Sequence, residues 1–148
     1  MASKITLYGV QHTRSARCEW TLLELGLEFE YIGDSSLIGS EQLRTLHPHA
    51  KVPTIVIDGE PLFESAAICS YRCDMQENQT LLARSGTRER ATHEQWVSFA
   101  QSEIEGYLWS NAKHTAFYPE HKRVAAVVEP NNTEIKKGLE VMEDALSE

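Results

Sequence analysis

Residues 51–68 read KVPTIVIDGEPLFESAAI, and this stretch decides the fold of the first half of the chain. Residues 52–57 form an apolar run with a proline near its start, a position that a β-strand tolerates. Asp58-Gly59 predicts a tight hairpin into Pro61–Phe63, so these two strands are expected to be antiparallel. A helix is expected to open at Glu64-Ser65.

The residues before this stretch predict a strand, a helix and another strand. Residues 4–9 and 29–32 have the pattern of short strands, and residues 14–26 between them repeat apolar side chains at helical spacing. Thr13 stands where the N-cap of this helix is expected. The apolar positions that predict its buried face are Ala16, Trp20, Leu23 and Leu27. With a short helix over residues 41–46, the first half predicts the order βαβαββα.

The second half shows no strand pattern and predicts helices alone. One apolar stripe runs from Trp96 to Leu108, and a second runs from Ile135 to Leu146 after a cap at Asn132 or Thr133, with Pro130 in the loop between. We therefore expect an α/β domain over residues 1–76, a linker over 77–86 and an all-α domain over 87–148.

Composition excludes several classes of partner. The 148 residues include 14 basic and 22 acidic side chains, a net charge of −8, which disfavours nucleic acid and anionic membranes as partners. No apolar run approaches the roughly 20 residues that span a bilayer, and no secretory leader is apparent. Three cysteines, an odd number, fit a reducing compartment. We expect a cytoplasmic protein.

Several motifs occur together in an order and spacing that resembles the cytosolic glutathione transferase family. They are Leu7-Tyr8-Gly9, Thr13–Arg17, Trp20–Leu27, Lys51-Val52-Pro53 and the run from Asp58 to Ile68. The second half resembles the bacterial branch of that family around Glu94-Gln95-Trp96, Leu108-Trp109 and Tyr118-Pro119. The resemblance implies a thioredoxin-like N-terminal domain with a mixed sheet and an all-α C-terminal domain. It also implies that this helical domain is shortened, because the family's domain normally continues through further helices.

Glutathione is the co-substrate that the resemblance implies, held mostly by the first domain. The resemblance also implies a cis peptide bond before Pro53, although spacing alone favours a trans proline that starts a strand. A cis bond would expose the Val52 backbone at the sheet edge, where an extended peptide pairs like an added strand. Lys51 is then placed to reach the glycyl carboxylate as a point charge.

Glu64 and Ser65 suit the other end of glutathione. A γ-glutamyl group carries a carboxylate and an ammonium on one carbon. A helix N-terminus with the Ser65 hydroxyl accommodates the carboxylate, and the Glu64 side chain pairs with the ammonium. The alternative is that both residues only cap the helix.

Catalysis in this family needs a hydrogen-bond donor that stabilises the glutathione thiolate. The bend after the first strand contains neither Cys nor Tyr. We expect Thr13 in this role, with Ser15 second and Tyr8 third, because Thr13 stands at the predicted N-cap and matches the place where related bacterial sequences of the family tend to carry Ser or Thr. The alternative for Thr13 is a purely structural N-cap.

The sequence departs from the family's usual pattern in one loop, and it departs from the thioredoxin redox pattern in the bend after the first strand. His47-Pro48-His49-Ala50 replaces the usual Asn-Pro-x-Gly, which puts the shape of that loop in question. Disulfide exchange of the thioredoxin type is disfavoured because the bend lacks Cys. Cys69 and Cys73 are one helical turn apart, but position 76 is Gln, so we predict no metal and expect cysteines buried as small apolar residues.

The predicted function is therefore transfer of glutathione to a small, hydrophobic electrophile, as in detoxification. The alternative is a catalytically inactive scaffold of the same fold that binds other proteins. An uncovered apolar stripe in the second half predicts a homodimer.

Overall fold

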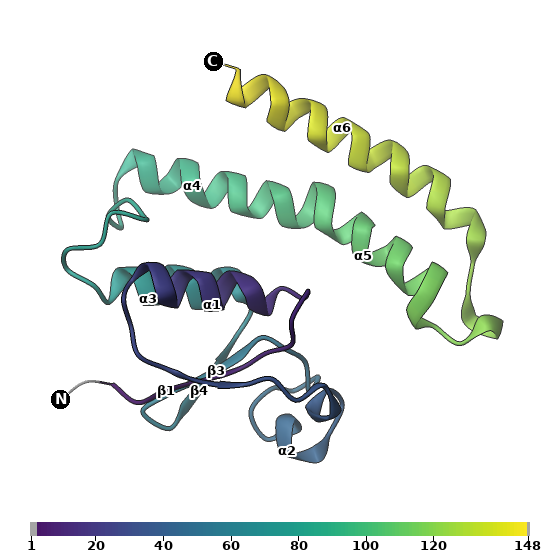
Figure 1. The fold of residues 1–148 in the computed structure, drawn as a ribbon. Helices are drawn as coiled ribbons and strands as arrows, with labels where there is room; N and C mark the ends of the chain where they lie inside the picture. The colour runs from purple at the N-terminus through teal and green to yellow at the C-terminus, as the bar shows by residue number, and fades with distance from the viewer. Residues whose placement is uncertain (1–2, 148) are drawn as a thin grey trace. The chain divides into compact units, whose positions relative to one another are not determined.

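The computed structural model describes residues 3–147 of the chain. The first half contains seven main elements in the order βαβαββα, as the sequence predicts (Figure 1). These are β1 (Ile5–Tyr8), α1 (Ser15–Glu24), β2 (Glu30–Ile32), α2 (Glu41–Arg44), β3 (Thr54–Ile57), β4 (Glu60–Phe63) and α3 (Ser65–Asp74), with a 3₁₀ turn over Ser35–Leu37 before α2.

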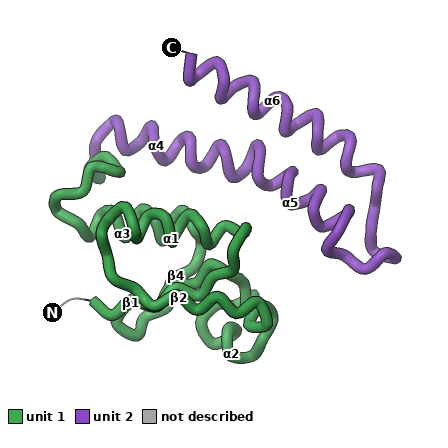
Figure 2. The backbone as a smooth tube through the Cα atoms, viewed as in Figure 1, with its two compact units in different colours: residues 1–85 green, residues 86–148 purple. Residues whose placement is uncertain are grey.

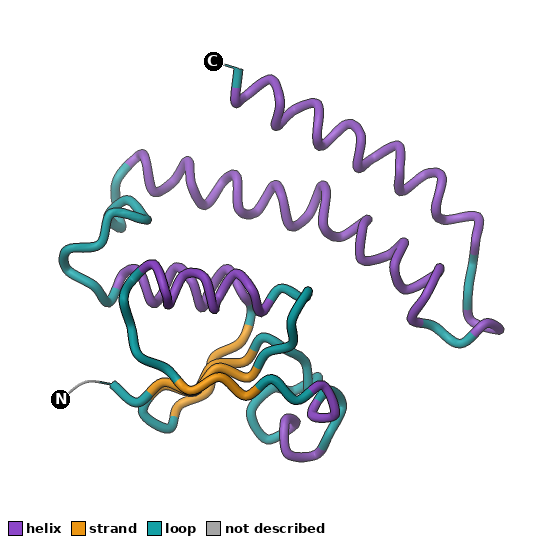
Figure 3. The backbone as a smooth tube through the Cα atoms, viewed as in Figure 1, coloured by secondary structure: helices purple, strands orange, loops and turns teal. Residues whose placement is uncertain are grey.

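The four strands form one mixed sheet in the order β2-β1-β3-β4 (Figure 3). β1 and β2 are parallel, whereas β3 is antiparallel to both β1 and β4. Asp58 and Gly59 join β3 to β4 with φ angles of 52° and 93°, which is the tight turn expected from their sequence. The sheet and its helices form the thioredoxin-like arrangement that the resemblance implies.

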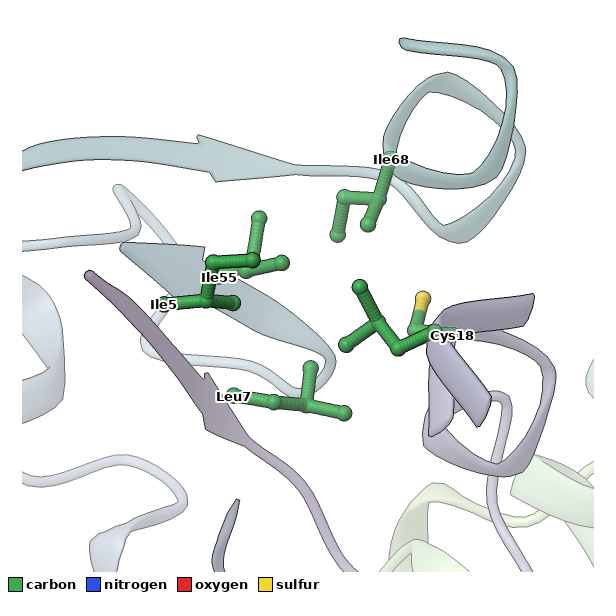
Figure 4. Packing of buried hydrophobic residues seen from close by; sticks show 6 residues of the cluster. Ile5, Leu7, Cys18, Ile55 and Ile68 are labelled. Atoms are coloured by element: carbon green, nitrogen blue, oxygen red, sulfur yellow. The ribbon is translucent and has the colours of Figure 1, made fainter. Parts of the chain in front are cut away.

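The core of this half lies between the sheet and the paired helices α1 and α3. Ile5 and Leu7 on β1, Ile55 on β3 and Ile68 on α3 are buried, and Cys18 and Leu22 of α1 complete the cluster (Figure 4). Burial of such side chains contributes about 1.5–3 kcal/mol each.

The buried face predicted for α1 is wrong within the helix, although Leu27, just beyond its end, packs against the core as predicted. Trp20 is 68% exposed and Leu23 is 61% exposed, whereas Ser15, Cys18 and Leu22 are the buried residues of this helix. Apolar residues occur on more than one side of α1, so helical periodicity alone predicts burial of the side that carries the bulkier residues. Two of the three inward side chains, Ser15 and Cys18, are small, which allows α1 to pack closely against α3 and β1, and Leu22 contributes to the core cluster.

The second half is helical throughout, apart from its connecting turns. Its elements are α4 (Arg88–Phe99), a π-helical segment (Ala100–Glu105), α5 (Gly106–Ala112), a second π-helical segment (Lys113–Phe117), 3₁₀ turns at Glu120–Lys122 and Ala125–Val127, and α6 (Val128–Leu146). The chain divides into two compact units, the first ending at Ser85 and the second beginning at Gly86 (Figure 2). Across residues 3–147, no helix is both long and apolar enough to cross a membrane.

α6 begins earlier than predicted, and neither Asn132 nor Thr133 caps it. The helix starts at Val128, and Pro130 lies in its first turn, where a backbone N–H has no partner within the helix and its absence costs little. The Asn132 side-chain oxygen instead accepts a hydrogen bond from the Asn111 amide of α5 at 2.8 Å. The Asn131 amide donates to the Asn111 oxygen at 2.8 Å, so these amides fasten α6 to α5.

Gly138 brings α6 close to the first π-helical segment. A Cβ atom at this position would lie 2.8 Å from Ile104 Cγ1 and 3.0 Å from the Glu103 carbonyl oxygen. Gly138 is buried, whereas Leu139 is 53% exposed, so the contact face of α6 is centred one residue away from the predicted apolar stripe.

Candidate functional site

Strand register brings three separate segments to one end of the sheet. Tyr8, the last residue of β1, pairs with Thr54, the first residue of β3, and Thr54 also pairs with Phe63, the last residue of β4. The bend after β1, the Lys51–Pro53 segment and the start of α3 therefore continue from neighbouring positions at the same edge. This edge contains all the site residues that the sequence predicts.

The Val52–Pro53 peptide bond is cis, as the resemblance implies. The ladder between β1 and β3 ends at the Tyr8–Thr54 pair, before Val52 is reached. Within residues 3–147, neither the N–H nor the C=O of Val52 has a hydrogen-bond partner. The backbone of Val52 can therefore pair with an extended peptide laid along this edge. Lys51 is exposed beside it, and its carbonyl accepts a hydrogen bond from the Thr54 hydroxyl at 2.9 Å.

Glu64 and Ser65 form the N-terminus of α3 without capping it through their side chains. Glu64 has φ of 71°, the left-handed region, which costs a non-glycine residue about 1–3 kcal/mol. Its carbonyl begins the helix by accepting from the Ile68 N–H at 2.9 Å, but its exposed carboxylate makes no cap hydrogen bond. Strain at an exposed acidic residue beside a helix N-terminus favours a ligand-binding role over helix capping.

The bend between β1 and α1 is held by a small hydroxyl network. The Thr13 hydroxyl donates to the Val10 carbonyl at 2.6 Å, and its oxygen accepts from the Ser15 N–H at 3.2 Å. The two hydroxyl oxygens of Thr13 and Ser15 are 2.8 Å apart, and Ser15 Oγ accepts from the Val10 N–H at 3.2 Å. These hydrogen bonds fix Thr13 at the surface near the start of α1 and fix Ser15 in a buried position next to Thr13.

The two predicted thiolate donors therefore occupy different positions. Thr13 is exposed, whereas Ser15 is fully buried, with an exposed fraction of 0%. The predicted N-cap is displaced by one residue, because Arg14 occupies the cap position without a side-chain hydrogen bond. Tyr8 lies within β1 with its side chain half-buried. Of these residues, Thr13 has the hydroxyl best placed to meet a ligand at the surface.

Gly9 allows this bend to pack tightly. A Cβ atom there would lie 2.8 Å from Ser15 Cβ and 2.9 Å from the Tyr31 hydroxyl oxygen. These contacts are shorter than van der Waals packing permits, so a larger residue would displace the start of α1.

His47 is a residue of this edge that sequence reasoning did not assign. Its buried ring lies 4.4 Å from the Phe63 ring, centroid to centroid, and its Nδ1 accepts a hydrogen bond from the His49 N–H at 2.9 Å. An asparagine at this position would accept from the same N–H in an Asx turn. His47 therefore closes the loop as the family's usual Asn would, and Ala50, with φ of 47°, adopts the conformation that favours Gly.

Burial lowers the pKa of His47 below its ordinary value, and the positive charges of His49 and Lys51 act in the same direction, although Glu64 opposes them. The neutral ring is the form that can accept the His49 hydrogen bond through Nδ1. The signal for His47 was present in the sequence as a departure from the Asn-Pro-x-Gly pattern.

This edge places an unpaired backbone strand, a helix N-terminus with a free carboxylate, and a surface hydroxyl within a thioredoxin-like unit. Residues 3–71 match the family described as "Glutathione S-transferase, N-terminal domain". Over these residues the first unit is therefore similar to the N-terminal domain of that family.

Curated relatives support the same family. Glutathione S-transferase U10 of Arabidopsis thaliana is 34% identical over 104 residues, which are 69% of this chain and 45% of that protein. Glutathione transferase GST 23 of Zea mays is 31% identical over 94 residues, which are 63% of this chain and 42% of that protein. The chain thus spans less than half the length of these two relatives.

Among solved structures, the chain is similar to the glutathione transferase URE2P6 from Phanerochaete chrysosporium, determined in complex with oxidized glutathione. The TM-score is 0.85 at 26% identity, and the match covers 99% of this chain and 69% of the other. The likeness includes the helical second half, so the fold expected for both halves is confirmed.

Proposed function

We propose that the chain binds glutathione at the edge formed by Val52, Glu64 and Ser65 and stabilises its thiolate through Thr13, for transfer to a small electrophile. The observation that carries this proposal is the strand register that gathers these segments at one end of the sheet. The similarity to glutathione S-transferases and to a structure with oxidized glutathione bound supports it.

Each end of glutathione has a matching group at this edge. The cysteinyl backbone pairs with the free N–H and C=O of Val52, which fixes the tripeptide in an extended form. The γ-glutamyl carboxylate lies at the N-terminus of α3 beside Ser65, and its ammonium pairs with Glu64. Lys51 pairs with the glycyl carboxylate as a point charge.

Thr13 activates the thiol by hydrogen bonding to its charged form. In the unliganded bend its proton is donated to the Val10 carbonyl, so binding requires the hydroxyl to rotate toward the sulfur. Its oxygen still accepts from the Ser15 N–H, which holds the side chain at the start of α1. A donor that favours thiolate over thiol lowers the pKa of the bound thiol and raises the concentration of nucleophile. We assign Ser15 a positioning role through its contact with Thr13.

Activity with 1-chloro-2,4-dinitrobenzene and retention on immobilised glutathione test the proposal. Thr13→Val should lower kcat by about 100-fold or more with little change in retention, because one donor to a developing anion is lost. Ser65→Ala and Glu64→Gln should weaken retention and raise KM for glutathione. Thr92→Val is the matched control, since the Thr92 hydroxyl donates to the Arg88 carbonyl within α4 of the second unit.

Full activity of Thr13→Val would refute the assignment of the donor, and unchanged retention of both Ser65→Ala and Glu64→Gln would refute the binding edge. Retention of the unaltered chain without turnover would instead support the scaffold function. We further propose that the electrophile is small and hydrophobic, that the chain forms a homodimer, and that it belongs to the bacterial branch of the family. A cytoplasmic location suits the three free cysteines.

A further inference from the structure

His47 is linked to both segments of the candidate binding edge. Its buried ring packs against the Phe63 ring, with 4.4 Å between the centroids and 36° between the planes, and Phe63 directly precedes Glu64. Along the chain, the turn that begins at His47 leads through Ala50 to Val52. One buried side chain therefore contacts one segment of the edge and belongs to the turn that positions the other.

Two hydrogen bonds close this turn. The Ala50 N–H donates to the His47 carbonyl at 2.8 Å, and the His49 N–H donates to His47 Nδ1 at 2.9 Å. The Ala50 carbonyl accepts from the Gly39 N–H at 2.9 Å, which fixes the turn to the segment before α2. Ala50 is fully buried and has φ of 47°, a conformation that a non-glycine residue keeps only when its surroundings hold it. The His47 ring is therefore one of the groups that hold the strained residue before Lys51.

The hydrogen bond from the His49 N–H requires a neutral His47 ring. Nδ1 accepts only while it carries no proton, and an imidazolium has an N–H at both nitrogens. Protonation therefore directs one N–H at another in a largely buried turn, where a hydrogen bond that is not made is costly. The closed turn belongs to the neutral form of the ring.

The charges around His47 do not reverse this preference. Burial is the main cause of the lowered pKa of His47; Glu64 opposes it, and the positive charges of His49 and Lys51 add to it. In the proposed complex, the glutathione ammonium pairs with Glu64 and the glycyl carboxylate pairs with Lys51. The ligand then offsets one charge of each sign, and burial remains the dominant effect.

We propose that His47 is a positioning residue of the glutathione site, whose neutral ring holds the backbone of residues 50–52 in the binding conformation and whose protonation weakens glutathione binding. The inference rests on the proposed function, because it requires the tripeptide to pair with Val52. His47 acts through the turn and needs no contact with the ligand. A ligand that binds only the neutral form loses affinity by up to about tenfold for each pH unit below the pKa of the ring.

The test measures the Kd of S-methylglutathione by isothermal titration calorimetry at pH 7.0 and pH 5.0. The thiol of this ligand is blocked, and its carboxylates and ammonium stay charged at both pH values, so its own titration contributes little. The Kd of the unaltered chain should rise at least about threefold at pH 5.0. His47→Asn keeps an acceptor for the His49 N–H without titrating. Its Kd should match that of the unaltered chain at pH 7.0 and change by less than about twofold at pH 5.0.

Two further variants separate the role of this ring from other effects. His47→Ala supplies no acceptor and should bind weakly at both pH values. His49→Asn is the matched control, because it keeps the backbone N–H and removes a second imidazole, whose centroid is 6.3 Å from that of His47; it should keep the dependence on pH. His12, in the bend after β1, is present in every variant, so its titration does not distinguish them. Circular dichroism at pH 5.0 separates weakened binding from unfolding.

Identical pH dependence in the unaltered chain and His47→Asn would overturn the inference while leaving the proposed function intact. Loss of the pH dependence in His49→Asn would also overturn it, since the other ring would then be responsible. Absence of binding by the unaltered chain at pH 7.0 would refute the proposed function and the inference with it. The decisive comparison uses only the unaltered chain and the conservative variant, so it stands if His47→Ala fails to fold.

Discussion

Each of the two units of this chain is stabilised internally in a different way. The first has a core in which Leu7, Leu22 and Ile55 have no exposed surface. From Gly86 to Ser147, only Ile104 and Gly138 are buried, and α6 is attached to its neighbours by a close backbone approach and by amide hydrogen bonds.

This difference explains where a ligand site can be built. Site residues need backbone segments whose positions are fixed to a fraction of an ångström, and a sheet packed against two helices provides that rigidity. Every candidate residue accordingly lies at one end of the first unit's sheet. The second unit has few buried apolar side chains, and several large ones on α5 and α6 remain exposed, among them Leu108, Trp109 and Leu139.

The strongest test of this comparison is the same substitution in each unit. Ile55→Ala should lower the free energy of unfolding near the upper end of the about 2–5 kcal/mol range, because its tightly packed neighbours cannot collapse into the cavity. Ile104→Ala should lower the free energy of unfolding by an amount near the lower end of the same range, because the side chains around Ile104 are more exposed and can relax. Urea denaturation followed by circular dichroism measures both, and equal losses would contradict the comparison.

A glycine pair tests the close approach within the second unit. Gly138→Ala should cost about 1–3 kcal/mol of unfolding free energy, because the new methyl group meets Ile104 and the Glu103 carbonyl oxygen. Gly106→Ala is the control: its Cβ would lie 3.5 Å from the Gln101 carbonyl oxygen, an ordinary contact. Alanine's greater helix propensity should then stabilise the helix by up to about 1 kcal/mol. Thermal denaturation measures both, and a stabilising Gly138→Ala would show that α6 does not pack as described.

The amide hydrogen bonds predict a smaller and graded effect. Asn111→Ala removes the hydrogen bonds to both Asn131 and Asn132 and should cost about 1 kcal/mol, since each partly exposed bond contributes at the low end of its usual range. Asn132→Ala removes one of the two and should cost about half as much. Urea denaturation should rank the two variants in this order, and the reverse order would assign the stabilisation elsewhere.

Replacing His47 should have the smallest effect on stability, and this effect depends on pH. Its pKa in the folded chain is below the ordinary value of 6.5, chiefly because of burial. As pH falls through 6.5, the unfolded chain binds a proton that the folded chain does not, so the stability of the first unit falls with pH. His47→Asn keeps an acceptor for the His49 N–H but does not titrate, and should weaken this dependence. Urea midpoints measured between pH 7.5 and 5.5 in the two proteins decide it, and identical slopes would refute the assignment.

Much of the first unit could be predicted because its signals are local. Asp58-Gly59 specifies a tight turn through its backbone preferences, and alternating apolar runs specify strands whose partners are near in sequence. The positions of Val52, Glu64 and Ser65 followed from a resemblance in motif order. In contrast, Pro130 was expected in a loop although it lies in the first turn of α6, because Asn132, an apparent cap, uses its side chain to bind Asn111.

The distinction between Thr13 and Ser15 could not be drawn from the sequence. Both are small hydroxyl residues at the start of one helix, and only the path of the bend buries one and exposes the other. The same holds for α1, where Trp20 had the stronger apolar signal but Cys18 faces the core. Likewise, His47 carried a recognisable departure from the motif, but its ability to replace an asparagine depends on where its Nδ1 lies.

The sequence by itself determined the order of the strands and helices of the first unit, the hairpin turn, and the segments that could form a site. These depend on backbone preferences and on apolar periodicity, which act between residues close along the chain. Only the tertiary structure decided which face of each helix is buried and which hydroxyl reaches the surface. Those outcomes depend on contacts between residues distant in sequence, and close packing selects among faces that periodicity leaves equivalent.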